Sequence, residues 1–212
     1  MKQELKAASL SSRLVKRAVL ALFALRGYRL PPAEPVPQRC VILGVPHTTN
    51  WDFVFFIGVT YHYGLTPSFI GKESLFRWPL RRFMFDMGGI PIDRRAKGRN
   101  YAEQVVDAFA QREELALVIA PEGTRSPVTV WRTGFYHIAL QAGVPLLPAW
   151  ANQETRQGGI GPAITLTGDM PADLQRVLDF YESVMPGHPR FAALKATIDA
   201  AAGEKDVRGF AD

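Results

Sequence analysis

The sequence predicts a single α/β domain, in which a mixed, mostly parallel β-sheet is flanked by helices, with a basic amphipathic helix at the N-terminus. Three observations support this prediction. The chain has 212 residues, enough for one medium-sized domain with a full core. Short apolar runs alternate with longer amphipathic ones, which is the pattern of a sheet layered with helices. The run Leu115 to Ala120 is almost wholly apolar, as expected of a strand that is buried on both faces.

The first 30 residues hold the positive charge of the chain. They carry +6, whereas the remainder carries −1, so a nucleic-acid binder with a basic body is disfavoured. The longest uncharged apolar run, Ala18 to Leu25, is too short to span a bilayer. Arg26 interrupts the run where a signal peptide would continue. Residues 1–30 therefore fit a basic amphipathic helix on an anionic membrane leaflet, and equally a helix that packs on the domain by its apolar stripe.

Residues 31–38 contain four prolines and predict an extended linker between this helix and a domain over residues 39–212. Strands are expected near 39–45, 67–71, 89–93, 115–120, 144–150 and 162–167. Helices are expected near 51–64, 74–86, 98–112, 132–142, 171–185 and 189–202. The stretch Gly158 to Gly161 is interpreted as a turn, because Pro162 follows it.

The most informative stretch runs from Val45 to Asp52. Pro46 disfavours helical geometry at Val45, so a strand followed by a sharp loop and then a helix is expected. That arrangement places His47 just past the carboxyl end of a strand and Asp52 in the first turn of a helix, where the helix dipole favours a carboxylate. The carboxylate can accept one ring N–H of His47 and leave the other ring nitrogen as an acceptor for a substrate proton.

Basic residues follow three other predicted strands. Lys72 follows the second strand, Arg94 the third, and the loop Glu122 to Arg125 the fourth. Because ligands gather beyond the carboxyl ends of strands in such sheets, these side chains are expected near His47. Lys and Arg together with freed backbone amides are suited to binding a phosphate monoester.

Four stretches together resemble the four sequence blocks of the glycerolipid acyltransferase family, whose best-known members are the 1-acylglycerol-3-phosphate acyltransferases. The match covers roughly residues 40–150, and its His-x4-Asp and Glu-Gly-Thr-Arg blocks are the specific ones. In chain order the blocks are His47 to Asp52, Gly89 to Arg94, Pro121 to Ser126 and Val144 to Pro148.

The resemblance implies transfer of a fatty acyl group from an acyl-CoA or acyl-carrier-protein thioester to a hydroxyl of a lysophospholipid. In that reaction His47 is the general base and Asp52 its orienting partner. The residues expected at the acceptor-phosphate site are Arg94, Glu122, Gly123, Thr124 and Arg125, with Lys72 added from its position alone. The chain departs from the family at Ala120, where an aromatic residue is common, and in being short, which leaves the acceptor's identity open.

The expected mechanism needs neither a protein nucleophile nor a cofactor. His47 takes the proton of the acceptor hydroxyl, while Asp52 fixes the ring tautomer and stabilises the imidazolium. The sequence contains no Gly-x-Ser-x-Gly elbow, and Cys40 lies inside a predicted strand. The acyl thioester is thus a co-substrate that reacts directly with the acceptor.

Three alternatives remain open at the level of sequence. The first is an acyltransferase for a different lipid acceptor, such as an amino-acid lipid or a lipid A precursor. The second is a metal-dependent phosphoesterase that uses His47 and Asp52 as ligands. However, His62, His137 and His188 show no metal-ligand spacing, so no metal site is predicted. The third is a lipid-binding module without turnover.

The expected location is cytoplasmic and peripheral, at the inner face of a membrane. The single cysteine excludes an intramolecular disulfide and fits a reducing compartment. A second membrane-facing segment is expected where aromatic and basic residues alternate, a mixture suited to a lipid–water interface. The residues of this segment are Phe76, Arg77, Trp78, Arg81, Arg82 and Phe83. The expected partners are therefore a lysophospholipid, an acyl thioester, an anionic membrane surface and, for one class of donor, acyl-carrier protein.

Overall fold

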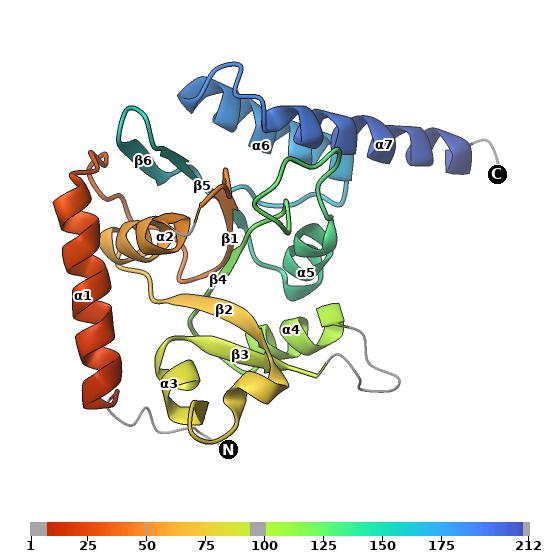
Figure 1. Cartoon of the computed structure of the whole chain (residues 1–212). Helices are drawn as coiled ribbons and strands as arrows, with labels where there is room; N and C mark the ends of the chain where they lie inside the picture. The colour runs from red at the N-terminus through yellow and green to blue at the C-terminus, as the bar shows by residue number, and fades with distance from the viewer. Residues whose placement is uncertain (1–7, 50, 94–100, 210–212) are drawn as a thin grey trace.

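The structure is a computed structural model and describes residues 8–49, 51–93 and 101–209, with burial and side chains described only as far as residue 203. In these residues one six-stranded sheet has the order β3-β2-β4-β1-β5-β6 (Figure 1). Neighbouring strands are parallel, except that β6 runs antiparallel to β5. The predicted mixed, mostly parallel sheet is confirmed. Its strands are β1 (Arg39–Val45), β2 (Pro67–Lys72), β3 (Gly89–Ile92), β4 (Leu115–Ile119), β5 (Leu146–Asn152) and β6 (Gln157–Ile160).

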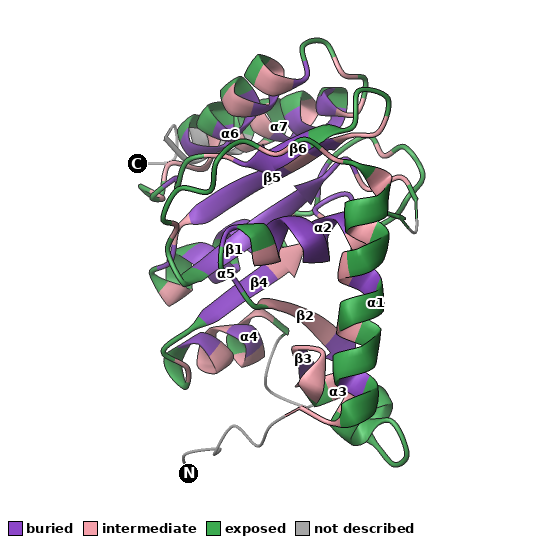
Figure 2. Ribbon diagram, turned by 90° about the vertical axis from the view of Figure 1, so that its left-hand side faces the viewer, coloured by how far each residue is buried: buried purple, intermediate pink, exposed green. Residues whose placement is uncertain are grey.

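Helices cover both faces of this sheet (Figures 1 and 2). They are α1 (Leu10–Arg26), α2 (Trp51–His62), the 3-10 helix η1 (Glu73–Phe76), α3 (Arg81–Asp86), α4 (Tyr101–Ala110), α5 (Gly134–Ala142), α6 (Met170–Val184) and α7 (Phe191–Gly209). Alternate residues of a strand point to opposite faces, and β1 shows this clearly. Cys40 and Ile42 pack with Phe55 of α2, whereas Val41 and Leu43 pack with the cluster formed by α4 to α7.

Helix α1 lies against the domain through its inner face. Ser9 caps its start and Gly27, in the left-handed conformation, ends it. The ring of Phe23 fills the space in which a Cβ at Gly58 of α2 would lie, at 2.2 Å. At the other end of the helix, the Ser9 N–H donates to Asp86 of α3. No helix among the described residues is long and apolar enough to cross a membrane.

The last strand lies earlier in the chain than the sequence predicted. Residues 162–167 form no strand, and only Ile164 makes an isolated bridge, to Leu146. The turn expected over Gly158 to Gly161 is also wrong, because β6 is Gln157–Ile160. Packing explains why residue 158 is a glycine: the ring of Phe55 lies 2.3 Å from where a Cβ at Gly158 would be. A strand with two glycines in its interior has the same sequence pattern as a turn.

The single helix expected over 74–86 is also wrong. The segment contains η1 and α3 instead, with the residues around Pro79 between them. Proline lacks a backbone N–H, and its ring clashes with the preceding helical turn, so a continuous helix cannot pass through this position. The helix expected at 98–112 is present as α4, although residues 98–100 lie outside the described part of the chain.

Candidate active site

His47 and Asp52 lie where β1 ends and α2 begins. β1 is in the interior of the sheet, between β4 and β5, and its last residue, Val45, pairs with Trp150 of β5. His47 follows two residues later, and Asp52 is the second residue of α2. The short loop between them brings the two side chains together, as the sequence predicted.

The carboxylate of Asp52 contacts several groups of this loop. Its Oδ2 accepts the backbone N–H of Thr49 at 2.7 Å and that of Thr48 at 2.5 Å, and it lies 3.2 Å from Nδ1 of His47. The Asp52 side chain is 2% exposed and the His47 side chain 28%. Because the buried carboxylate contacts Nδ1, the Nδ1–H tautomer is favoured, and Nε2 is left as a proton acceptor in a partly open position.

A hydrogen-bonded chain of two further residues, which were not predicted, ends at Asp52. Gln153, just after β5, donates from Nε2 to Oδ1 of Asp52 at 3.3 Å. The hydroxyl of Tyr28, in the segment after α1, donates to Oε1 of the same glutamine. Glutamine and tyrosine occur widely at such positions, so no spacing in the sequence singled them out.

Glu122 lies on the other side of the His47 loop. Its Oε2 accepts the backbone N–H of His47 at 2.8 Å, and the side chain is buried. Burial raises the pKa of Glu122, although the His47 N–H and the nearby guanidinium of Arg190 act in the opposite direction. Glu122 is predicted to belong to the acceptor-phosphate site; in the structure it contacts His47 and Arg190, and its binding role stays a prediction.

The guanidinium of Arg190, from the segment before α7, contacts the loop after β4 that also carries Glu122. It donates to the carbonyl oxygens of Ser126 at 2.9 Å and Arg125 at 2.6 Å. One of its nitrogens lies 3.5 Å from Oε1 of Glu122. Arg190 lies outside the four sequence blocks, and no sequence pattern predicts that it would lie next to Glu122.

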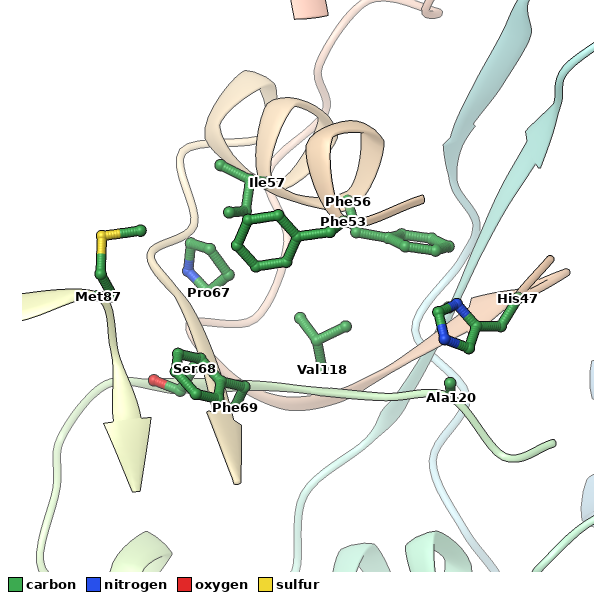
Figure 3. Close-up of a pocket in the computed structure, with 11 residues that line it drawn as sticks. His47, Phe53, Phe56, Ile57, Pro67, Ser68, Phe69, Met87, Val118 and Ala120 are labelled. Carbon is green, nitrogen blue, oxygen red and sulfur yellow. The ribbon is translucent and has the colours of Figure 1, made fainter. Parts of the chain in front are cut away.

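An apolar cavity of about 200 Å³ begins beside the His47 ring (Figure 3). It lies between α2 and the strands β1, β2 and β4. The ring of His47 stands at one end, and Met87 and Pro67 are near the other. The remaining lining residues are Gly44, Phe53, Phe56, Ile57, Ser68, Phe69, Val118 and Ala120. A polar, partly exposed base at the edge of an apolar cavity is an arrangement that suits a substrate with an apolar chain and a reactive polar end.

The remaining predicted binding residues lie at strand ends. Lys72 is the last residue of β2 and is exposed. Thr124 and Arg125 are exposed in the loop after β4, and Gly123 has a φ of +67°, which favours glycine. Arg94 lies outside the described residues. Their binding roles stay predictions.

Two other kinds of reactive group, a thiolate and a metal ion, can be compared with the groups that the structure describes at the site. Burial raises the pKa of the Cys40 thiol to about 12, so Cys40 is not a thiolate nucleophile. Among the residues that the structure describes, no three His, Cys, Asp or Glu side chains converge in a way that could hold a metal ion. The paired imidazole and carboxylate beside the cavity are suited to general-base chemistry.

Comparison with known proteins identifies the same region. A sequence model of the Acyltransferase family matches residues 30–152. The chain is 31% identical over 136 residues to a 1-acyl-sn-glycerol-3-phosphate acyltransferase of Haemophilus influenzae, covering 60% of this chain and 54% of that protein. The proteins of the same name from Salmonella typhimurium and Escherichia coli are 32% and 30% identical over 133 residues, with 60% of this chain and 53% of each protein covered.

The chain spans about half the length of these curated relatives. The matched segment contains β1 to β5, the His47–Asp52 pair and the loop with Glu122. It covers more than half of the chain. The protein therefore belongs to the Acyltransferase family.

Proposed function

We propose that this protein transfers a fatty acyl group from an acyl-CoA or acyl-carrier-protein thioester to a hydroxyl of a lysophospholipid such as 1-acylglycerol-3-phosphate. One observation carries the proposal: the His47 ring lies at the end of an apolar cavity, and its Nδ1 contacts the buried carboxylate of Asp52. The names of the curated relatives support this choice of acceptor.

In the proposed reaction, Nε2 of His47 removes the proton of the acceptor hydroxyl as its oxygen attacks the thioester carbonyl. Asp52 holds the ring in the required tautomer and stabilises the imidazolium. The carbon–sulfur bond then breaks, and the imidazolium returns the proton to the departing thiolate. The products are the acylated lipid and a free thiol, and the base is regenerated.

The cavity is the proposed site of the acyl chain. Its lining is almost entirely apolar, and its one strongly polar group is the ring of His47 (Figure 3). An acyl chain in the cavity would bring its thioester carbonyl towards that ring and exclude water from it. The exposed side chains of Lys72 and Arg125 are the proposed partners of the acceptor phosphate, since both can supply positive charge at strand ends on the His47 side of the sheet.

The test is thiol release from acyl-CoA and acyl-carrier protein with a panel of lysolipid acceptors, with and without chelator. We expect release that depends on a phosphate-bearing acceptor and persists with chelator. His47→Ala should lower kcat by at least about 10²-fold, because the base is lost, while the circular dichroism spectrum is unchanged. Near-normal turnover in this variant would refute the assignment. Release of phosphate from the acceptor without thiol release, abolished by chelator, would favour a metal-dependent phosphoesterase instead.

We also propose that the enzyme works on a membrane surface. The outer face of α1 carries exposed leucines: Leu10, Leu14 and Leu25 lie on the side opposite the buried Ser12 and Val19. At the end of α1 near α3, Trp78 is 91% exposed and lies close in sequence to three exposed arginines. Apolar side chains beside cations are suited to anionic lipid. The arginines are Arg77, Arg81 and Arg82.

Sedimentation with lipid vesicles tests this second proposal. The double variant Leu14→Glu with Trp78→Ala should bind vesicles containing anionic lipid roughly tenfold or more weakly than the unchanged protein, because apolar contacts with the bilayer are lost. Leu140→Glu is the matched control, since Leu140 is also exposed but lies on α5. Equal loss in the control, or undiminished binding by the double variant, would contradict the proposed surface.

A further inference from the structure

Arg190, in the connection between α6 and α7, contacts the loop after β4, and through Glu122 in that loop it is linked to the His47 loop. It lies directly before α7, outside the segment that the family model matches. Its guanidinium donates to the carbonyls of Arg125 and Ser126 and lies 3.5 Å from the carboxylate of Glu122. That carboxylate in turn accepts the backbone N–H of His47. Arg190 and Glu122 thus form a continuous path from the segment before α7 to the backbone of His47.

Glu122 depends on this arginine for its charge balance. The side chain is fully buried, and Oε1 has no hydrogen-bond partner among the described residues apart from its ion pair with Arg190. A buried carboxylate that loses its cation is strongly disfavoured, because it keeps its desolvation cost without the compensating attraction. Without Arg190, the Glu122 side chain would be expected to move or to bind a proton, and its contact with the His47 N–H would change.

The position of Arg190 is itself fixed. The next residue, Phe191, is fully buried and stacks on Tyr181 of α6, with ring centroids 5.4 Å apart. The Tyr181 hydroxyl donates to the carbonyl of Leu43 in β1 at 3.0 Å. β1 is the strand that leads to His47, so Arg190 and His47 are held relative to one another by the same strand.

We propose that Arg190 is a positioning residue for the base: through Glu122 and the loop after β4 it fixes the His47 loop at the edge of the cavity. The inference rests on the proposed acyl transfer. The side chain of Arg190 does not touch a reacting atom in this scheme. Its planar guanidinium bonds two carbonyls and faces a carboxylate at once, an arrangement that a lysine ammonium cannot reproduce.

Arg176 offers a matched control within the same part of the chain. It also pairs with a buried carboxylate, that of Asp173, and donates to the carbonyl of Thr165. Thr165 follows Ile164, which bridges to Leu146 at the start of β5, whereas His47 lies beyond the opposite end of the neighbouring β1. Arg176→Ala therefore removes an arginine from a buried carboxylate at a distance from the base.

The experiment compares Arg190→Ala, Arg190→Lys and Arg176→Ala in the full chain. For each we would measure kcat and KM with the acyl thioester, the melting temperature, and the backbone amide resonance of His47 after selective ¹⁵N labelling of the four histidines. Arg190→Ala should lower kcat by about 10²-fold with KM for the thioester changed by less than about threefold, as expected when a reactive group is displaced. The His47 amide resonance should shift. Arg190→Lys should be intermediate, and Arg176→Ala should keep kcat and the His47 resonance even if it melts earlier.

The outcomes separate this inference from the proposed function. If the unchanged protein releases no thiol with any acceptor, acyl transfer fails, while the His47 resonance still decides whether Arg190 positions the base. If the unchanged protein is active and Arg190→Ala keeps kcat within about twofold, or leaves the His47 resonance in place, the positioning role is overturned. Should Arg190→Ala not fold, Arg190→Lys decides in the same way, because it keeps a positive charge near Glu122. Full kcat and an unshifted His47 resonance in that variant would overturn the role.

Discussion

Two buried carboxylates, Asp52 and Asp173, are held in nearly the same way in two different regions of the molecule. Each lies in the first turn of a helix, α2 or α6, and accepts a threonine backbone N–H and a threonine hydroxyl. Each also contacts one ring-bearing side chain: His47 for Asp52, and Tyr136 for Asp173.

The difference lies in what surrounds the ring. His47 is partly exposed and lines the cavity, whereas Tyr136 is 1% exposed and belongs to the core between the sheet and α4 to α7. A carboxylate at the start of a helix is therefore a common way to fix a loop. It becomes part of a candidate active site only where the group that it orients can reach a ligand.

Asp52→Asn tests this comparison with the largest expected effect, a loss of kcat. The amide oxygen can keep the backbone N–H bonds of Thr48 and Thr49, but the NH2 group cannot accept the bonds that Oδ1 now accepts. The neutral amide also cannot stabilise the imidazolium and can favour the wrong ring tautomer. A fall in kcat on the order of 10²- to 10⁴-fold is expected, as in catalytic triads. Steady-state thiol release measures it, with urea unfolding as the check that the fold is kept. A kcat within about fivefold of the unchanged protein would remove Asp52 from the mechanism.

A smaller effect, on stability and not on rate, is expected for Asp173→Asn. Loss of the charged acceptor should lower the free energy of unfolding by about 1.5–3 kcal/mol at neutral pH, since hydrogen bonds to charged groups are involved. Thiol release at a temperature well below the melting point should be unchanged. A loss of kcat comparable to that of Asp52→Asn would break the comparison, because it would make the two carboxylates functionally equivalent.

The pH dependence of this stability effect has a definite sign. Burial acts to raise the pKa of Asp173, but the bonds from Tyr136, Thr167 and Arg176 outweigh it and hold the pKa below its ordinary value. A carboxyl with a lowered folded-state pKa stabilises the fold above its unfolded pKa, near 3.9 or so, and loses this contribution as the pH falls through the folded value. The free energy of unfolding of Asp173→Asn and of the unchanged protein can be measured in urea from pH 7 to 3. The difference between the two values should become smaller below about pH 4.

The strands with ordinary side chains could be predicted from sequence, and the glycine strand could not. β1 to β5 lie within two residues of the expected bounds at each end, because apolar runs report burial directly. β6 contains Gly158 and Gly159, whose neighbours Phe55 and Pro31 occupy the space that side chains would fill. The information that makes this segment a strand is thus in residues distant in the sequence.

The same limit applies to the candidate site. The spacing of His47 and Asp52 predicted their contact because a sharp strand-to-helix loop leaves few other arrangements. The contact of Glu122 with Arg190 could not be predicted, because Arg190 lies in the connection before α7 and no local pattern links that connection to Glu122. Arg190 itself is an arginine in a proline-containing connection, a context that usually indicates a solvated side chain.

The placement of β1 in the sheet limits how the cavity can open. Both edges of β1 are hydrogen-bonded, to β4 and to β5, so the strand that leads to His47 cannot bend outwards without breaking two ladders of backbone bonds. α2, on the opposite wall, is held to the sheet by side-chain packing, with α1 outside it. A motion that widens the cavity would therefore be expected to move α1 and α2 more than β1 and the His47 loop.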